Sequence, residues 1–288
     1  MNGHPADRAR PRGGADAAAG HHVALGIDVG GTGVKAGVVD LDSGRLLSQR
    51  ARLRTPSPAT PDAVAGTVRQ VVELVAADYE LPAYLPVGCG LPGVVKDGRL
   101  LTAANIDPGW VGTSAEGLLG EALDRRVHAI NDADAAGIAE MRLGAGRGHS
   151  GTVLLLTIGT GIGSGLFVGG RLLPNTEFGH LEIKGYEAET ELSGAARERR
   201  GLKWREWAPE FNYFLDRLDA YLWPDLLIFG GGVSKSIDKY APLLKTRAPI
   251  VPATFLNTAG IVGAGLWAAD MEAGTEPARP ATAAGAAR

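Results

Sequence analysis

The sequence contains one cysteine, Cys89, and this scarcity excludes an intrachain disulfide and any zinc site built from several cysteines. Aromatic residues make up only 6% of the chain, too few for a surface that stacks nucleic-acid bases. The formal net charge of −3 provides no general basic field to attract nucleic acid. No apolar run approaches the roughly 18 residues of a membrane-spanning helix. These absences favour a protein of the reducing cytoplasm, with neither nucleic acid nor a membrane as partner.

The composition predicts a folded centre between two polar ends. The 288 residues are 45% hydrophobic, enough for the cores of one large or two medium domains. Both ends are rich in Ala, Gly, Pro and Arg, so residues 1–22 and 271–288 are expected to be disordered tails. The first of these segments carries no apolar stretch after its arginines, and no secretory signal is expected in it.

Three glycine-rich turns are the most informative feature of the chain. Each follows an apolar run that predicts a buried strand, and the turns are Asp28-Val-Gly-Gly-Thr-Gly-Val-Lys35, Thr157-Ile-Gly-Thr-Gly-Ile-Gly163 and Leu227-Ile-Phe-Gly-Gly-Gly-Val233. A strand that ends in glycines lets backbone N–H groups point into a cleft, and such arrays of amides bind phosphate oxygens. One such turn is common. Three in order predict two halves of a molecule that close on one phosphorylated ligand.

The order of the expected elements recurs along the chain. The first strands are expected at Val23–Asp28, Lys35–Leu41 and Leu46–Leu53. A helix follows from Thr60-Pro61-Asp62, where Thr is the expected N-cap and Pro takes the first helical position. After a second helix over Asp132–Leu143, another set of strands begins near Gly151. This recurrence predicts two related lobes with a cleft between them.

A strand end carries the first candidate for chemistry. The apolar residues Val127–Ile130 lead into Asn131-Asp132, at the start of an alanine-rich helix. Two interpretations of Asp132 are open: a plain helix N-cap, or a carboxylate in a cleft that accepts a proton from a hydroxyl during group transfer. The phosphate-binding turns elsewhere favour the second. Asp134 is expected to be a cap or a first-turn acid.

The second candidate is the pair Glu177 and His180, three residues apart. If this stretch is helical or tightly turned, both polar groups lie on one side. A carboxylate and an imidazole together suit vicinal hydroxyl groups, since each accepts or donates hydrogen bonds. A structural histidine beside a surface acid is the alternative for this pair.

These motifs in their order resemble the ROK family of sugar kinases, repressors and related proteins. The set is Asp-x-Gly-Gly-Thr-x-x-Lys, Asn-Asp-Ala, Gly-Thr-Gly-x-Gly, Glu-x-x-His and Gly-Gly-Gly, and the resemblance runs from about Val23 to Ala269. Within the family, Asn105-Ile-Asp-Pro-Gly-Trp110 and Phe178-Gly-His-Leu-Glu-Ile183 are similar to the polyphosphate glucokinases, which phosphorylate glucose with inorganic polyphosphate, ATP or both. The implied fold is the α/β, two-lobed actin-like ATPase (RNase H-like) fold, each lobe a mixed sheet flanked by helices.

The resemblance implies a division of the chain and an activity. Residues 23–130 would form a small N-terminal lobe to which a helix over 258–270 returns, and residues 131–257 a large C-terminal lobe. The activity would be that of a polyphosphate-dependent glucokinase, with transfer to the 6-hydroxyl of glucose from polyphosphate, ATP or both. A strictly ATP-dependent hexokinase, acting on glucose, mannose or another hexose, is the alternative. A non-catalytic sugar sensor and an actin-like filament protein are less consistent with the motifs.

The resemblance also implies a role for each site residue. Asp132 would be the catalytic base. The residues that would hold the sugar ring are Asn105, Asn131, Glu177, His180 and Glu189, the last because it stands four residues before Ser193; Glu191 is its rival. The residues that would bind phosphates are Asp28, Gly30, Gly31, Thr32, Lys35, Thr160, Gly161 and Gly163. The adenosine of ATP would lie at Gly230, Gly231 and Gly232.

Cofactors and partners follow from the same resemblance. Mg²⁺ is expected with the phosphoryl donor, near Asp28. Many ROK proteins hold zinc with the histidine of Gly-His and three closely spaced cysteines, but no cysteine stands between His180 and Trp207, so no zinc is expected here. A homodimer is expected from the resemblance alone.

The binding track for polyphosphate, a long polyanion, has two interpretations. Basic residues gather after Ser193, at Arg197, Arg199, Arg200, Lys203 and Arg205. Glu198 and Glu206 stand among them, and such mixed charge is typical of a solvated helix surface. The cluster is therefore either such a surface or a polyphosphate track. Lys184, Lys235 and Lys239 are further candidates of similar weight.

Overall fold

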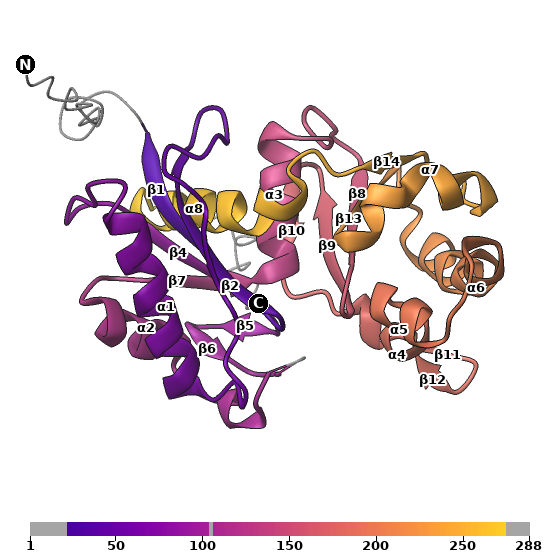
Figure 1. The fold of residues 1–288 in the computed structure, drawn as a ribbon. Helices are drawn as coiled ribbons and strands as arrows, with labels where there is room; N and C mark the ends of the chain where they lie inside the picture. Colours follow the sequence, from indigo (N-terminus) through magenta and orange to yellow (C-terminus); the bar gives the residue numbers. More distant parts are fainter. Residues whose placement is uncertain (1–21, 104–105, 275–288) are drawn as a thin grey trace, which may run out of the picture.

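Two five-stranded sheets lie at the centres of two lobes in the computed structural model, which describes residues 22–103 and 106–274. Figure 1 shows the lobes side by side, with helices around each sheet. The expected α/β fold with two mixed sheets flanked by helices is confirmed. Most of the two tails expected at 1–22 and 271–288 lies outside the described residues. Among the helices of the described ranges, none is long and apolar enough to cross a membrane.

The first sheet has the strand order β3-β2-β1-β4-β7. Its strands are β1 (Val23–Gly30), β2 (Gly33–Asp40), β3 (Ala51–Leu53), β4 (Val87–Leu91) and β7 (His128–Asn131). The strands β1, β4 and β7 are parallel, whereas β2 and β3 are antiparallel to their neighbours. β3 is shorter than the strand expected from Leu46, because Leu46 makes only an isolated bridge with Val39.

The second sheet repeats this arrangement with the order β10-β9-β8-β13-β14. Its strands are β8 (Thr152–Ile158), β9 (Ile162–Val168), β10 (Arg171–Leu173), β13 (Leu226–Gly230) and β14 (Ile250–Pro252). The strands β8, β13 and β14 are parallel, whereas β9 and β10 are antiparallel to their neighbours. Two small hairpins complete the strands: β5 (Val95–Lys96) with β6 (Arg99–Leu100), and β11 (Glu182–Ile183) with β12 (Tyr186–Glu187). The same topology in both lobes accounts for the recurrence seen in the sequence.

Amphipathic helices bury the outer faces of the sheets. The helices are α1 (Pro61–Ala76), α2 (Ala115–Leu123), α3 (Asp132–Leu143), α4 (Ala188–Leu192), α5 (Gly194–Arg199), α6 (Trp204–Leu222), α7 (Ile237–Tyr240) and α8 (Ala259–Glu272), with short 3-10 segments η1 (Pro108–Trp110), η2 (Phe178–His180), η3 (Gly232–Ser236), η4 (Ala241–Leu243) and η5 (Leu256–Thr258). Thr60 caps α1 as expected, and valines at helical spacing bury one face of α1 in the first core. In the second lobe, α6 buries Trp207, Phe211 and Phe214.

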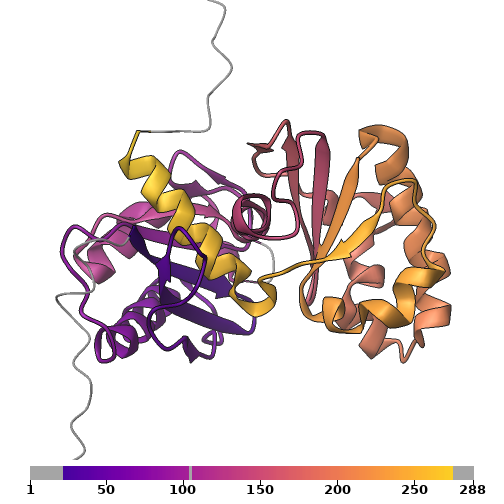
Figure 2. The same cartoon turned by 90° about the horizontal axis from the view of Figure 1, so that it is seen from above.

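Two helices, α3 and α8, pack against each other between the sheets, and Figure 2 shows them at the junction of the lobes. α8 also lies across β1 and β4 of the first sheet. Glycines make this packing close: a Cβ on Gly26 would lie 1.9 Å from the Ile261 carbonyl oxygen, and one on Gly263 only 1.6 Å from that of Ala135. The small-residue helix expected near the end of the chain therefore packs backbone against backbone.

Helix α8 ends later than the sequence predicts. It was expected over 258–270, with a tail from 271, but it continues to Glu272. The Glu272 carboxylate lies 2.9 Å from Nε2 of His128, a buried residue of β7, and this contact anchors the last turn of the helix on the first lobe.

The topology brings the glycine-rich turns together. The parallel strands β1, β4 and β7 of one lobe and β8 and β13 of the other end at edges that face the same cleft. In open α/β sheets, ligands bind outside the carboxyl ends of the strands. The candidate site is therefore built from the residues that directly follow these strands.

Candidate active site

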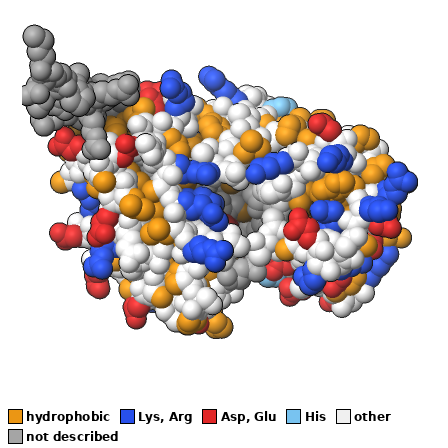
Figure 3. All heavy atoms as spheres, viewed as in Figure 1, with side chains coloured by type: hydrophobic (Ala, Val, Ile, Leu, Met, Phe, Trp, Pro, Cys, Tyr) orange, Lys and Arg blue, Asp and Glu red, His pale blue; other side chains and the backbone are white. Residues whose placement is uncertain are grey.

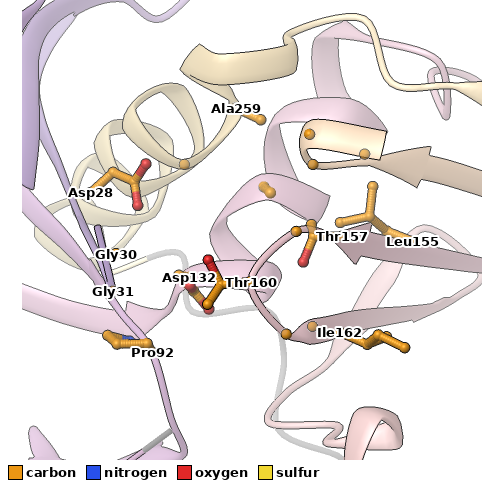
Figure 4. A pocket seen from close by; sticks show the side chains of 18 of the residues that line it. Asp28, Gly30, Gly31, Pro92, Asp132, Leu155, Thr157, Thr160, Ile162 and Ala259 are labelled. Carbon is orange, nitrogen blue, oxygen red and sulfur yellow. The ribbon is translucent and has the colours of Figure 1, made fainter. Parts of the chain in front are cut away.

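A cleft of about 310 Å³ lies between the lobes and receives residues from both. Figure 4 shows Asp28 and Thr157 on opposite sides of it, with Asp132 and Thr160 next to each other between them in this view. The cleft collects residues of all three glycine-rich turns, and those predicted from the sequence are Gly30, Gly31, Thr32, Thr160, Gly161, Gly163, Gly230, Gly231 and Gly232. The turns that lie far apart in the sequence thus face one space.

A partly buried ion pair crosses the first glycine-rich turn. Asp28 near the end of β1 is the direct cross-strand partner of Lys35 on β2. The Lys35 ammonium donates a hydrogen bond to Oδ2 of Asp28 at 2.6 Å. Gly260 at the start of α8 leaves room for this carboxylate, because a Cβ there would lie 2.8 Å from Cγ of Asp28. Both charged groups line the cleft.

The structure distinguishes the two interpretations of Asp132. The N-cap of α3 is Asn131, whose Oδ1 accepts hydrogen bonds from the backbone N–H groups of Ala133 and Asp134, both at 2.9 Å. Asp132 takes the first helical position instead, and its carboxyl group faces the cleft. Burial raises the pKa of Asp132 to about 7, and the charge of Asp28 adds to the increase. A carboxylate with such a pKa is suited to accept a proton near neutral pH.

The side chain of Asn131 also bonds to two groups beside the cleft, the Gly93 carbonyl and the Glu177 carboxyl group. Its Nδ2 donates to the Gly93 carbonyl oxygen at 3.0 Å and to Oε1 of Glu177 at 3.1 Å. Glu177 lines the cleft, and burial raises its pKa. Since Glu177 directly precedes η2, one amide group fixes a strand end of the first lobe and a loop of the second.

His180 lies beside the cleft and is half-exposed. Its Nδ1 is 3.1 Å from Oε2 of Glu187, and its Nε2 is 3.7 Å from Oε2 of Glu177. Burial by itself would lower the pKa of His180, but these carboxylates and that of Glu189 raise it above the usual value. Glu187 thus engages one ring nitrogen of His180, and the contact of His180 with a sugar stays a prediction.

The structure separates the two glutamates that compete for the third sugar contact. Glu189 lines the cleft, where its Oε2 accepts a hydrogen bond from the Ile162 N–H at 3.2 Å. Glu191 pairs instead with Arg200, at 3.4 Å. Of the two, Glu189 is the one that lines the cleft, and its contact with a sugar stays a prediction. Asn105, the remaining residue of the predicted sugar set, lies outside the described residues.

Two groups of side chains could offer ligand atoms to a metal ion, one inside the cleft and one around His180. Asp28 and Asp132 offer carboxylate oxygens within the cleft, which suits a hard cation such as Mg²⁺. His180, Glu187 and Glu189 offer ligand atoms within 4.8 Å of one another, but His180 and Glu187 already bond to each other.

A match to the model of the ROK family covers residues 24–198. The chain belongs to the ROK family. It is 49% identical over 243 residues to a polyphosphate glucokinase of Mycobacterium tuberculosis (strain CDC 1551 / Oshkosh). The aligned region covers 84% of this chain and 89% of the relative.

Solved structures of ROK proteins have the same fold. The inorganic polyphosphate/ATP-glucomannokinase of Arthrobacter sp. strain KM superposes with a TM-score of 0.84 at 50% identity, over 86% of this chain and 99% of that one. A ROK family glucokinase of Streptomyces griseus, solved in complex with glucose and AMPPNP, has a TM-score of 0.74 at 28% identity. This match covers 85% of this chain and 99% of that one.

Sequence reasoning did not predict the contacts of two residues that support this ROK protein's site, Asp134 and Asn175. Asp134 is fully buried, and its Oδ2 accepts a hydrogen bond from the Asn175 N–H at 2.7 Å, while burial raises its pKa to about 8. Asn175 in turn bonds to both the N–H and the carbonyl of Val95 in the first lobe, at 2.8 and 2.9 Å. In the sequence, these contacts are indicated by position alone: Asp134 lies in the first turn of α3, and Asn175 stands two residues before Glu177.

Proposed function

We propose that this ROK protein is a polyphosphate-dependent glucokinase, which transfers a phosphoryl group from inorganic polyphosphate or ATP to the 6-hydroxyl of glucose. The observation that carries this proposal is the Asp132 carboxyl group, which faces a cleft lined by the glycine-rich turns of both lobes. The similarity to the polyphosphate glucokinase of Mycobacterium tuberculosis and to the Arthrobacter polyphosphate/ATP-glucomannokinase supports polyphosphate and glucose as substrates.

Asp132 is the general base of the proposed reaction. The sugar oxygen attacks the terminal phosphorus of the donor, a new P–O bond forms, and the bond to the rest of the donor breaks. The proton of the 6-hydroxyl passes to the Asp132 carboxylate, whose pKa of about 7 keeps it basic enough to accept it. Little covalent chemistry is asked of the protein, which chiefly aligns the reactants and compensates charge.

The remaining residues bind the two substrates. Asn131, Glu177 and Glu189 form the proposed sugar side of the cleft, with His180 and Asn105 as further predicted contacts. The backbone N–H groups of the first two glycine-rich turns cradle the phosphates. Gly230–Gly232 line the same cleft, which supports ATP as a second donor.

Mg²⁺ is the proposed cofactor, and the cleft suits it. The charge of Asp28 raises the pKa of Asp132, which shows that the two carboxyl groups interact within the cleft. Lys35, which bonds to Asp28, is the neighbouring cation. Asp28 would hold the ion, which would supply charge compensation for the phosphates of the donor. The expected lack of zinc, the homodimer and the cytoplasmic location stay predictions.

A coupled assay of glucose 6-phosphate formation tests the proposal. The protein is supplied with glucose, Mg²⁺ and either polyphosphate or ATP, and we expect product with both donors. Product with ATP alone would leave an ATP-dependent hexokinase. Glucose binding without product from either donor would leave a sugar sensor.

A further inference from the structure

We propose that the polyphosphate chain leaves the cleft over the edge of the first sheet, along the arginines Arg50, Arg52 and Arg54 of the β3 segment. This inference rests on the proposed function and gives the long donor a path that a nucleotide does not need. The three arginines stand at alternate positions and are all exposed. In an extended chain, alternate side chains project from the same face.

Strand register connects this basic row to the phosphate-binding turn. Arg52 is the direct partner of Lys35 across β2 and β3, and Lys35 is the direct partner of Asp28 across β1 and β2. The three side chains therefore project from one face of the sheet, in a row from its edge to the cleft. Neighbouring strands are about 4.8 Å apart, so the row spans roughly 10 Å.

The Arg52 side chain is directed towards the turn that would hold the donor's terminal phosphate. Its Nη2 lies 3.5 Å from the carbonyl oxygen of Thr32, and a Cβ on Gly33 would lie 2.9 Å from its Nε. Gly33 thus provides the space that the guanidinium occupies. Thr55, just beyond Arg54, donates a hydrogen bond to the Gly30 carbonyl oxygen at 2.5 Å and ties the end of this segment to the same turn.

These arginines are available to an anion, because within the described part of the chain none of them forms an ion pair with a carboxylate. β3 is the edge strand of its sheet, so its outer side is open to a ligand. Figure 3 shows Lys and Arg side chains in a line beside the hollow between the lobes. A polyanion laid along such a line gains several charge-assisted contacts without any base recognition.

The basic cluster after Ser193 is less suited to this role, because three of its arginines already make side-chain contacts and two of these pair with glutamates. Arg200 bonds to Glu210 at 2.7 Å, and Arg197 stacks on the ring of Trp204 at 3.9 Å. Arg199 donates to the Thr190 carbonyl oxygen at 2.6 Å. Of the two interpretations of this cluster, the structure favours a solvated helix surface.

The test compares donors in variants of the full chain. We measure kcat/KM with long-chain polyphosphate, tripolyphosphate and ATP for Arg52→Gln, Arg52→Lys and the triple variant of Arg50, Arg52 and Arg54 to Gln. Arg205→Gln is the matched control, since it removes an exposed arginine from the other cluster. Thermal melting with and without glucose verifies that each variant is folded.

We expect Arg52→Gln to lower the ratio of kcat/KM for long-chain polyphosphate to that for ATP by about tenfold, and the triple variant to lower it further. Arg52→Lys should retain part of the ratio, because it keeps the charge and loses the planar fork. The triple variant should also weaken the salt dependence of kcat/KM with long-chain polyphosphate. Arg205→Gln should change the ratio by no more than about twofold.

Two results would overturn the inference. An unchanged ratio in the triple variant would leave the arginines only the role of preventing edge-to-edge pairing of the sheet. An equal fall in Arg205→Gln would move the track to the other cluster. Failure of the proposed function is distinguishable from both, because the unmodified protein would then form no glucose 6-phosphate from polyphosphate.

Discussion

The carboxyl group of Asp132 is not used to cap its helix, because the neighbouring residue Asn131 is the N-cap. Asn131 supplies the N-cap bonds of α3, so the aspartate that follows is not needed for capping. Burial then disfavours its charged form, and Asp28 repels that charge further. The raised pKa is thus a consequence of where β7 ends and α3 begins.

The pH dependence of activity is predicted from this pKa. A general base must be ionised, so kcat/KM should fall about tenfold per pH unit below about pH 7. The measurement is kcat/KM for glucose from pH 5.5 to 9 with saturating donor. A profile that stays level from pH 5.5 to 7 would contradict the role of Asp132.

Asp132 should also lower the stability of the fold near neutral pH. Its folded-state pKa is raised from 3.8 to about 7, so its stabilising contribution is complete below about pH 4 and is lost as the pH rises through 7. We therefore expect Asp132→Asn to raise Tm by a few °C at pH 8 and by less at pH 5. A melting series over this range measures it, and equal Tm gains at both pH values would show that the ionisation is not the cause.

At the scale of the elements, close backbone packing holds α8 between the first sheet and α3. Gly263 has no room for a side chain, since its Cβ would lie 1.6 Å from the Ala135 carbonyl oxygen. We expect Gly263→Val to destabilise the fold by about 3 kcal/mol, because helix backbones must separate to admit it. Denaturant unfolding measures the change.

Gly66 provides the control for that substitution. It also lies inside a helix, α1, but a Cβ there would meet nothing within 4 Å. Gly66→Ala should leave stability unchanged or raise it by about 0.5–1 kcal/mol. A similar loss in both variants would contradict close packing at Gly263 as the cause.

Local signals in the sequence predicted the elements that depend on local chemistry. The cap Thr60 and the start of α3 at Asp132 lie where expected, because capping is read from neighbouring residues. The ends of β3 and α8 were not predicted, since distant contacts set them: the pairing of β3 with β2, and that of Glu272 with His128. The Asn175–Val95 contact joins residues 80 positions apart, and no local pattern indicates it.

At the scale of the whole molecule, the side chain of Asn175 links the lobes near Glu177, which lines the cleft. Asn175 bonds through both its amide atoms to the backbone of Val95 in the opposite lobe. We expect Asn175→Ala to raise the glucose KM by about tenfold, because Glu177 two residues later would lose its fixed position. Steady-state kinetics with varied glucose measures this change.

Asn212 is the matched control for this prediction. Its side chain also bonds to a backbone N–H and a carbonyl oxygen, those of Lys245 and Leu243, but within the second lobe. Asn212→Ala should lower stability by about 1–2 kcal/mol and leave the glucose KM unchanged. An equal rise of KM in both variants would contradict a specific role for the contact between the lobes.

The central claim is that the cleft transfers phosphate from polyphosphate to glucose with Asp132 as base. The most direct test is glucose 6-phosphate formation from polyphosphate by the unmodified protein and by Asp132→Asn, with glucose binding measured by calorimetry on both. We expect turnover in the first, a loss of at least about a hundredfold in the second, and glucose affinity within a few-fold in both. Undiminished turnover in Asp132→Asn would contradict the claim.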